Sequence, residues 1–211
     1  LDSYAKYYAN WSAPWESQAL LRARVVTGDA VVAREYVNLI AGLRYPQDGL
    51  SAGHIREIRR IKARMEAERL PRGVDSSRHL KLGRGSISDV EWVVQLLQLC
   101  HGYRVPELQT TETLAGLAAA QGANLLTARE AKVLGEAWQF ASNLRDAVVL
   151  WTGRTSGPQL DVLPADRVAL NAVGRVLGYP QRTASQVQED YLRKARRARK
   201  VMERVFYGDD S

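Results

Sequence analysis

The chain has 211 residues, of which 45% are hydrophobic and 25% charged, so its composition is that of a folded protein and not of a disordered segment. No run of about 18 apolar residues is present, which argues against a helix that spans a membrane. The net charge is +7, and Tyr191 to Arg204 supply seven cations against the single acid Glu203, or +6. The single Cys100 excludes an internal disulfide.

Helix start and stop signals recur along the chain, whereas alternating strand patterns joined by Asn-Gly or Asp-Gly hairpin turns do not appear. The predicted helices cover residues 12–24, 29–45, 51–70, 86–102, 110–121, 127–151, 164–178 and 185–206. Between them, residues 72–85 are predicted to form an ordered loop and residues 153–164 a mobile one. The sequence therefore predicts an all-α fold, a bundle of about eight helices built as one core or as two packed subdomains.

The densest stretch runs from His79 to Trp92 and reads His-Leu-Lys-Leu-Gly-Arg-Gly-Ser-Ile-Ser-Asp-Val-Glu-Trp. Its two glycines precede a helix N-terminus, where backbone N–H groups can bind an anion with the help of Lys81 and Arg84. The spacing matches neither the P-loop nor the dinucleotide fingerprint. The alternative is structural: the glycines set the loop, Ser86 caps the helix, and the following acids satisfy backbone or arginine partners. Caps and turns are commoner than binding sites, so the residues alone favour this alternative.

Two metal-site hypotheses are rejected on spacing. Gly85-Ser86 followed by Asp89 and Glu91 imitates the Gly-Ser and Asp-x-Asp/Glu order of polymerase-β-type nucleotidyltransferases. On a helix, however, carboxylates two residues apart diverge by about 200°, so they cannot share a metal ion as they would on a strand. The three histidines are scattered and lack Cys or carboxylate neighbours at ligand spacing, so no zinc site is expected.

Two stretches resemble bifunctional glutamine synthetase adenylyltransferases. The run from Lys81 to Gln95 is similar to that family's signature Lys-x-Gly-x-Gly-Gly-Ile-x-Asp/Glu-Ile-Glu-Phe-x-x-Gln. Residues 15–24, followed by Gly28-Asp29, are similar to a second stretch that follows the family's catalytic strands. The resemblance spans about residues 4–207. The departures from the signature are Ser86 for the second glycine, Val90 for Ile and Trp92 for Phe.

This resemblance implies a parent enzyme with two homologous halves. One half transfers AMP from MgATP to a tyrosine of glutamine synthetase, and the other removes it by phosphorolysis. Because Gly208 to Ser211 read like a chain end, we favour the carboxyl-terminal half, which transfers AMP in the family. The family's metal-binding Gly-Ser and Asp-x-Asp elements should precede Leu1. We therefore expect no catalytic or metal-ligating residue and no cofactor in this chain, which should be inactive alone, while ATP and Mg²⁺ serve the parent.

The same resemblance suggests roles for parts of the chain. Residues 1–50 are expected to link from the preceding nucleotidyltransferase domain, and residues 51–211 to form a carboxyl-terminal helical bundle that orients the protein substrate and relays regulatory signals. The candidates for facing ATP or the domain interface are Lys81, Arg84, Arg22 and Arg24. The expected partners are glutamine synthetase, the preceding domain of the same polypeptide and the PII signalling protein, in the cytoplasm and away from a membrane.

The basic segment at residues 185–206 leaves an alternative function open. A cationic stripe beside an apolar stripe fits a solvated helix face, an acidic protein surface or nucleic acid. The solvated face is the commonest, and nucleic acid comes last because no reading-helix motif or cluster of stacking aromatics accompanies the stripe. The alternative to the adenylyltransferase hypothesis is therefore a basic helical adaptor that binds nucleic acid or an acidic protein.

Overall fold

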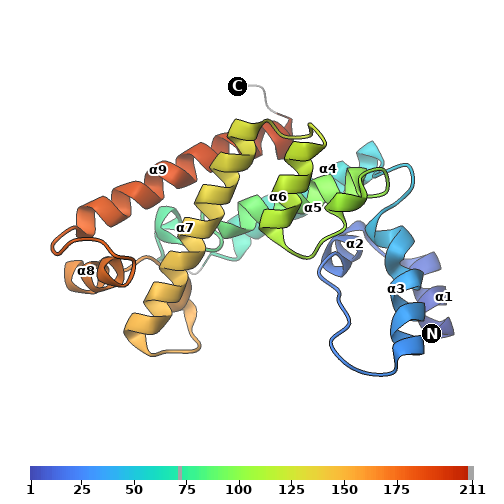
Figure 1. Cartoon of the computed structure of the whole chain (residues 1–211), viewed down its shortest axis with the longest axis horizontal. Helices are drawn as coiled ribbons and strands as arrows, with labels where there is room; N and C mark the ends of the chain where they lie inside the picture. Colours follow the sequence, from blue (N-terminus) through green and yellow to red (C-terminus); the bar gives the residue numbers. More distant parts are fainter. Residues whose placement is uncertain (71–72, 209–211) are drawn as a thin grey trace. The chain divides into compact units, whose positions relative to one another are not determined.

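The structure is a computed structural model that describes residues 1–70 and 73–208. Within these ranges the regular structure is helical, apart from an isolated antiparallel bridge between His79 and Val162. The α-helices of these ranges (Figure 1) are α1 Asp2–Trp11, α2 Pro14–Leu20, α3 Ala30–Arg44, α4 Ala52–Glu68, α5 Ile87–His101, α6 Thr113–Gly122, α7 Ala128–Thr152, α8 Arg167–Val176 and α9 Ala184–Met202. The shorter turns are η1 Ser76–Arg78, η2 Pro106–Leu108, η3 Pro158–Asp161 and the π turn η4 Glu203–Tyr207. The all-α prediction is confirmed.

Side-chain caps fix several helix starts. Asp29 accepts hydrogen bonds from the backbone N–H groups of Val31 and Val32 at 2.8 and 3.0 Å, so α3 begins where the sequence predicts. Asp166 caps α8 by accepting from Ala169 N at 2.8 Å. Because that cap lies at residue 166, α8 begins at Arg167 and not at the predicted position 164. The described part of the predicted loop 72–85 contains only the short turn η1.

The sequence prediction missed α1. This helix begins at Asp2, its N-cap residue Leu1 provides no side-chain cap, and none of its residues is buried. Its aromatic rings pack mainly on one another and on α3: Tyr4 and Tyr8 stack with ring centroids 6.3 Å apart, and Tyr4 meets Tyr36 edge-on at 5.9 Å. A helix with neither a cap nor a buried stripe gives a weak sequence signal.

The chain forms two compact units. Unit 1 contains Leu1–Lys62 and Val94–Thr127, and unit 2 contains Ala63–Val93 and Ala128–Ser211. The division falls within α4 and α5 and just before α7. The predicted division into linking helices at residues 1–50 and a helical bundle at residues 51–211 stays a prediction. In the part of the chain that the structure describes, no helix is long and apolar enough to cross a membrane.

Unit 2 has a core built by α7, α8 and α9 together with the loop before α5. Small residues on the facing helices, among them Ala141 and Ala195, allow the backbones to approach closely. The buried core residues are Leu80, Ile87, Ala141, Leu144, Ala147, Val148, Leu160, Leu163, Leu170, Val173, Ala184, Val187, Tyr191 and Ala195. The Tyr191 hydroxyl donates to the carbonyl of His79 at 3.2 Å, which ties α9 to the loop.

Unit 1 has a smaller core. Its fully buried side chains include Leu21, Ile40, Ile58 and Leu99. Gln98 of α5 donates from Nε2 to two carbonyls of the segment before α6, those of Leu108 and Thr110, each at 2.7 Å. The first 38 residues contribute little to this core, because only Gln18 and Leu21 among them are buried.

Candidate functional site

The glycine-rich loop before α5 lies against α9. Gly85 has a φ of +75°, and a Cβ added to it would lie 1.8 Å from the carbonyl oxygen of Ala195. A Cβ on Gly83 would lie 2.4 Å from the carbonyl oxygen of His79. Both positions therefore require glycine because backbone meets backbone there, and Gly85 also because of its left-handed conformation.

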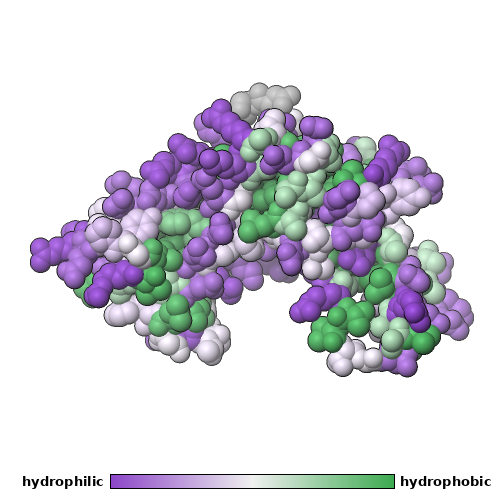
Figure 2. Space-filling model, viewed as in Figure 1, coloured by the Kyte–Doolittle hydropathy of each residue, from purple (hydrophilic) through white to green (hydrophobic). Residues whose placement is uncertain are grey.

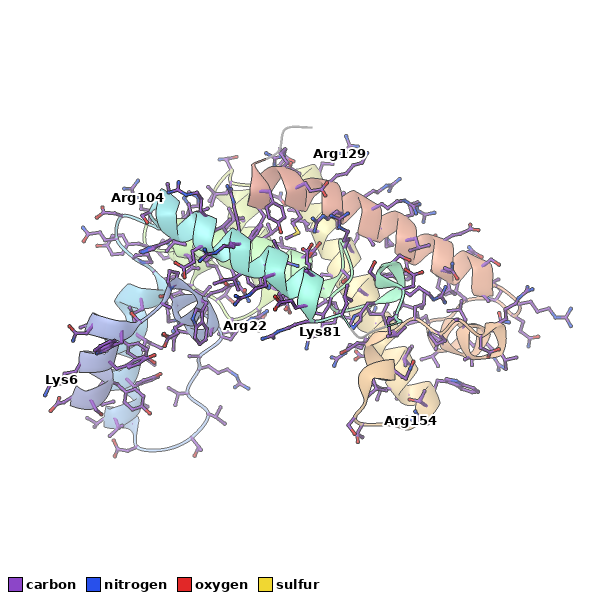
Figure 3. All side chains as sticks on the ribbon, turned by 180° about the vertical axis from the view of Figure 1, so that it is seen from behind. Lys6, Arg22, Lys81, Arg104, Arg129 and Arg154 are labelled. Carbon is purple, nitrogen blue, oxygen red and sulfur yellow. The ribbon has the colours of Figure 1, made fainter. Side chains whose placement is uncertain are left out.

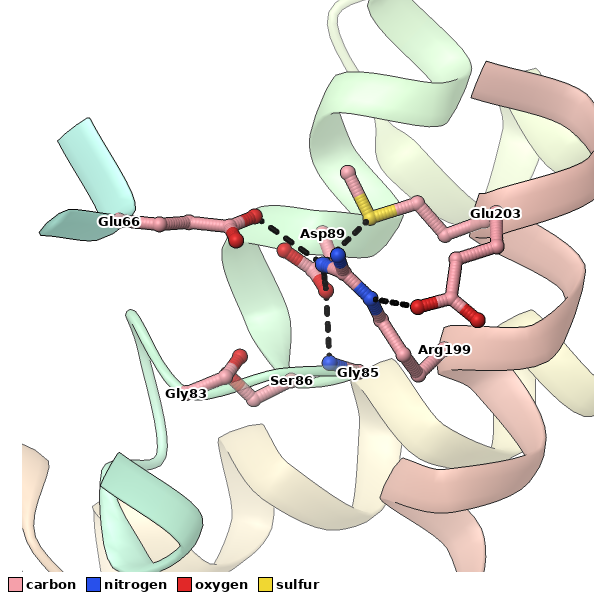
Figure 4. Close-up of polar contacts among 8 residues, drawn as sticks. Glu66, Gly83, Gly85, Ser86, Asp89, Arg199 and Glu203 are labelled. Atoms are coloured by element: carbon pink, nitrogen blue, oxygen red, sulfur yellow. Dashed lines mark hydrogen bonds and ion pairs between the residues drawn. The ribbon is translucent and has the colours of Figure 1, made fainter. Parts of the chain in front are cut away.

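An ion-pair cluster around the buried Asp89 holds this contact together (Figure 4). Asp89, which is 1% exposed, accepts from Gly85 N at 2.7 Å and from Arg199 Nη1 at 3.0 Å. The same guanidinium donates to Glu66 at 3.0 Å and, through Nε, to Glu203 at 2.8 Å. We call these five residues the Arg199 cluster. It joins the end of α4, the glycine-rich loop with α5, and α9.

The electrostatics of the cluster favour a permanent positive charge at its centre. Burial alone would lower the pKa of Arg199, but the hydrogen bond to Glu203 and the charges of Asp89 and Glu66 outweigh it and raise the pKa above its ordinary value. Each carboxylate of the cluster thus faces a guanidinium that remains cationic wherever the protein is folded.

The contacts of the Arg199 cluster support the structural interpretation of the glycine-rich loop. The N–H of Gly85, which could have met an anion, is donated to Asp89. Asp89 thereby satisfies backbone and arginine partners, as the structural interpretation predicts. At the predicted capping box, Asp89 accepts from the backbone N–H of Gly85, and Ser86 Oγ donates to the Gly83 carbonyl at 2.7 Å. Asp89 and Glu91 lie on a helix, as the spacing argument against a polymerase-β-type centre assumes.

The sequence analysis did not identify Arg199, although one signal could have found it. Arg199 lies four residues after Ala195 and three before Met202, so it occupies the apolar stripe of α9. A cation within an apolar stripe predicts a buried ion pair, because an unpaired buried charge is strongly unfavourable.

Lys81 and Arg84 lie together in the glycine-rich loop, and both side chains are exposed. The Lys81 backbone fixes the loop, since its N–H donates to His79 Nδ1 at 3.3 Å and its carbonyl accepts from Ser88 N at 3.0 Å. Its side chain reaches out from the ribbon (Figure 3). Neither side chain bonds to a residue in the described ranges, so these two cations remain available to a partner.

Arg22 and Arg24 lie in unit 1, in the connection between α2 and α3. Arg22 donates to the carbonyl of Thr111 at 2.6 Å and to Thr113 Oγ1 at 3.2 Å, so it holds this connection to the start of α6. Arg24 is exposed and lines a pocket of 440 Å³. The structure thus places the four candidates as two pairs, one in each unit.

The Arg24 pocket is apolar. Its lining consists of Leu1, Tyr4, Ala23, Arg24, Val25, Val26, Thr27, Gly28, Asp29, Val32, Ala33, Tyr36, Val37 and Ile40. Arg24 and Asp29 carry its only side-chain charges, and the Asp29 carboxylate is already engaged in capping α3. A triphosphate would meet a single cation there, whereas apolar side chains would find a matching surface.

Large apolar side chains are exposed around this pocket. We call them the apolar face of unit 1: Leu1, Tyr4, Tyr7, Trp11, Trp15, Val25, Val26, Val31 and Val32. Figure 2 shows apolar atoms gathered over the α2–α3 connection and the start of α3. The sequence analysis missed this face because residues 23–27 lack helical periodicity, so no pattern indicated which side chains are exposed. Exposed apolar surface on this scale is typical of an interface.

Burial shifts the pKa values of Cys100 and His79. Burial raises the pKa of the Cys100 thiol, which disfavours the reactive thiolate. Burial also lowers the pKa of His79, whose Nδ1 accepts from the N–H groups of Lys81 and Leu82. In residues 1–70 and 73–208, no group of three or more His, Cys, Asp or Glu side chains is arranged to hold a metal ion.

Comparison with known proteins identifies the family. A family model described as GlnD PII-uridylyltransferase matches residues 55–206, and a model described as glutamate-ammonia ligase adenylyltransferase matches residues 1–38. The chain is 53% identical over 208 residues to the bifunctional glutamine synthetase adenylyltransferase/adenylyl-removing enzyme of Leifsonia xyli, and equally to that of Streptomyces avermitilis. The corresponding enzyme of Mycobacterium leprae is 47% identical over 206 residues.

These alignments cover 98 to 99% of the chain but only 20% of each relative, so the chain spans about a fifth of the length of the curated relatives it matches. The GlnD-type model alone covers more than half of the chain. The chain therefore belongs to the family of that model, and the resemblance to glutamine synthetase adenylyltransferases predicted from its sequence is confirmed.

Proposed function

We propose that the chain is a regulatory and substrate-orienting helical segment of an enzyme that transfers AMP from ATP to a tyrosine of glutamine synthetase, and whose other half removes AMP by phosphorolysis. The names of the relatives support the parent reaction. In this proposal the partners are glutamine synthetase, the nucleotidyltransferase domain of the same polypeptide and the PII signalling protein, in the cytoplasm. ATP and Mg²⁺ bind in the rest of the parent, and the isolated chain is inactive.

The apolar face of unit 1 is the observation that carries this proposal. Of the fifteen large apolar side chains exposed among the described residues, nine lie in residues 1–32. The adenylyltransferase model matches that same region, at residues 1–38. The relatives are about five times longer than this chain, so they contain further structure that can cover such a face. We therefore assign residues 1–38 to the contact with the rest of the parent enzyme.

A segment that carries no reacting group can still control the rate of the parent. Phosphoryl and nucleotidyl transfer depend on alignment of the reacting groups, and a displacement of about 1 Å can cost roughly a hundredfold in rate. The Arg199 cluster holds the end of α4, the glycine-rich loop and α9 together. A segment held together in this way can position a bound partner relative to the catalytic domain.

The test uses the full-length parent and labelled AMP incorporation into glutamine synthetase. Val26→Glu combined with Val32→Glu places two charges in the apolar face, and we expect AMP transfer to fall roughly ten- to a hundredfold because the contact is displaced. The matched control is Val168→Glu with Val176→Glu, two exposed valines of unit 2, which should leave the rate within about twofold. Equal activity of the two double variants would contradict the proposed contact.

Lys81 offers a second test of the same function. Because its loop is held through backbone atoms, Lys81→Ala should leave the fold intact, with a change in unfolding free energy within about 0.5 kcal/mol. In the full-length parent we expect Lys81→Ala to slow AMP transfer, since the exposed ammonium faces ATP or the domain interface in this proposal. Unchanged kinetics would exclude Lys81 from both roles.

A further inference from the structure

The cations of α9 and the turn after it fall into two sets. The first set holds unit 2 together: Lys194 pairs with Glu136 of α7 at 3.1 Å, Arg204 pairs with Glu130 at the start of α7, and Arg199 forms its cluster. These ion pairs fix α9 along α7. The prediction of a solvated helix face therefore applies to only some of the cations in residues 185–206.

The second set lies on the opposite side of α9. Arg193, Arg196, Arg197 and Lys200 occupy positions i, i+3, i+4 and i+7, which is one face of a helix and about 10 Å long. We call this set the cationic stripe. Arg196, Arg197 and Lys200 are exposed, and none bonds to a residue in the described ranges. Arg193 pairs with Asp190 on the same helix, yet its side chain is still 51% exposed. Figure 2 shows hydrophilic surface along α9.

The stripe is held rigidly. The other face of α9 is buried through Val187, Tyr191, Ala195, Ala198 and Met202. The four cations thus cannot move apart by shifting the helix, although like charges three and four residues apart repel one another. An acidic partner relieves that repulsion without any rearrangement of the helix, which makes the stripe a preorganised docking surface.

The composition of the exposed face favours a protein partner over nucleic acid. Glu189 lies four residues before Arg193 on the same face and is exposed, so a carboxylate bounds the stripe at that end. The exposed positions of α9 hold no aromatic ring on which a base could stack. A short stripe bounded by an acid matches a compact acidic patch better than an extended phosphate backbone.

We propose that the cationic stripe of α9 docks an acidic patch on the protein that the parent enzyme modifies. This inference rests on the proposed function and names the surface through which the substrate protein, glutamine synthetase, is recruited. The arginines donate charge-assisted hydrogen bonds to carboxylates of the substrate, while Lys200 adds a point charge. The stripe touches no reacting atom, so it governs binding of the substrate protein and not the chemical step.

The test is a charge reversal in the full-length parent. The stripe variant carries Arg196→Glu, Arg197→Glu and Lys200→Glu. The control variant carries Arg56→Glu, Arg60→Glu and Arg64→Glu, three exposed cations of α4 that give the same change in net charge. Thermal unfolding of both variants is compared first. Steady-state AMP transfer is then measured at about 50 and about 200 mM salt, because electrostatic docking weakens as the screening length shortens.

We expect the stripe variant to raise KM for glutamine synthetase roughly tenfold at the lower salt, with kcat within about twofold of the parent, and the difference to shrink at the higher salt. The control variant should keep KM within about twofold. An unchanged KM in the stripe variant, or a fall in kcat alone, overturns the docking surface. If the stripe variant loses binding to random duplex DNA while its KM for glutamine synthetase is unchanged, the stripe binds nucleic acid and the docking surface is overturned.

The outcome also separates this inference from the function on which it rests. If the unmodified parent transfers AMP to glutamine synthetase and the stripe variant does so with the same KM, the proposed function stands and the docking surface fails. If the unmodified parent transfers no AMP to glutamine synthetase, the proposed function itself fails.

Discussion

The glycine-rich loop of unit 2 and the first 38 residues of unit 1 differ in how far the chain itself stabilises them. In unit 2 the loop lies in backbone contact with α9, and the buried Asp89 pairs with Arg199 of α9 and accepts from Gly85 N of the loop. In unit 1 the first 38 residues bury only Gln18 and Leu21, and they expose nine large apolar side chains.

The two regions come from different parts of the family resemblance. The loop lies in the region matched by the GlnD-type model, and the exposed residues lie in the region matched by the adenylyltransferase model. The backbone of the conspicuous glycine-rich motif thus makes close packing contacts, whereas the first 38 residues leave more large apolar side chains exposed. Dense motifs can arise from tight packing as readily as from chemistry.

The largest expected effect is at the centre of the Arg199 cluster. Arg199→Ala leaves Asp89 buried without its guanidinium, and we expect a loss of roughly 3–5 kcal/mol of unfolding free energy. Arg196→Ala, on the exposed side of the same helix, should change it by no more than about 0.5 kcal/mol. Urea unfolding followed by circular dichroism measures both. Similar losses in the two variants would show that the cluster contributes nothing beyond helix propensity.

Gly85 comes next. Gly85→Ala forces a left-handed conformation on alanine, at a cost of about 1–2 kcal/mol, and places a methyl group against the Ala195 carbonyl, which adds about 1–3 kcal/mol. Gly178 provides the matched control, because its φ is +81° and nothing lies within 4 Å of an added Cβ. Gly178→Ala should therefore show the conformational cost alone. If thermal unfolding gives equal losses for the two variants, the loop does not press on α9.

The pH dependence of stability tests the same loop. Burial holds the pKa of His79 below its ordinary value of 6.5. Below pH 6.5 the unfolded chain therefore binds the proton more readily than the folded chain, so stability is lost as the pH falls. We therefore expect the free energy of unfolding to fall between pH 7 and pH 5.

His79→Asn isolates this contribution, because asparagine can accept at the position of Nδ1 but does not titrate. Urea midpoints measured across this range should fall less steeply for His79→Asn than for the unchanged chain. Burial lowers the pKa of His101 as well, so part of the slope should remain. An unchanged slope in the variant would mean that His79 is accessible to solvent and protons in the folded chain.

Sequence reasoning succeeded where the signal was local. Pro14 and Asp29 mark helix starts through neighbouring backbone groups, and α2 and α3 begin where these residues predict. It failed for α1, which has no cap and buries no residue. It anticipated that Asp89 would bond to backbone and arginine, yet it could not name Arg199, because the two are 110 residues apart in the chain. That pairing depends on the packing of α9 against the loop.

The smallest expected effect lies in the apolar face of unit 1. Val26 is 76% exposed, so Val26→Ser in the isolated chain should change the unfolding free energy by no more than about 0.5 kcal/mol. Leu21→Ala, at a fully buried position in the same unit, should cost about 2–5 kcal/mol and shows that the assay detects unfolding of unit 1.

Urea unfolding at two protein concentrations distinguishes an apolar face that is free from one covered by a second copy of the chain. If Val26→Ser costs more than about 1 kcal/mol at the higher concentration only, the isolated chain covers this face by self-association. If it costs as much at both concentrations, the face is already buried within one chain, and the contrast between the two regions disappears.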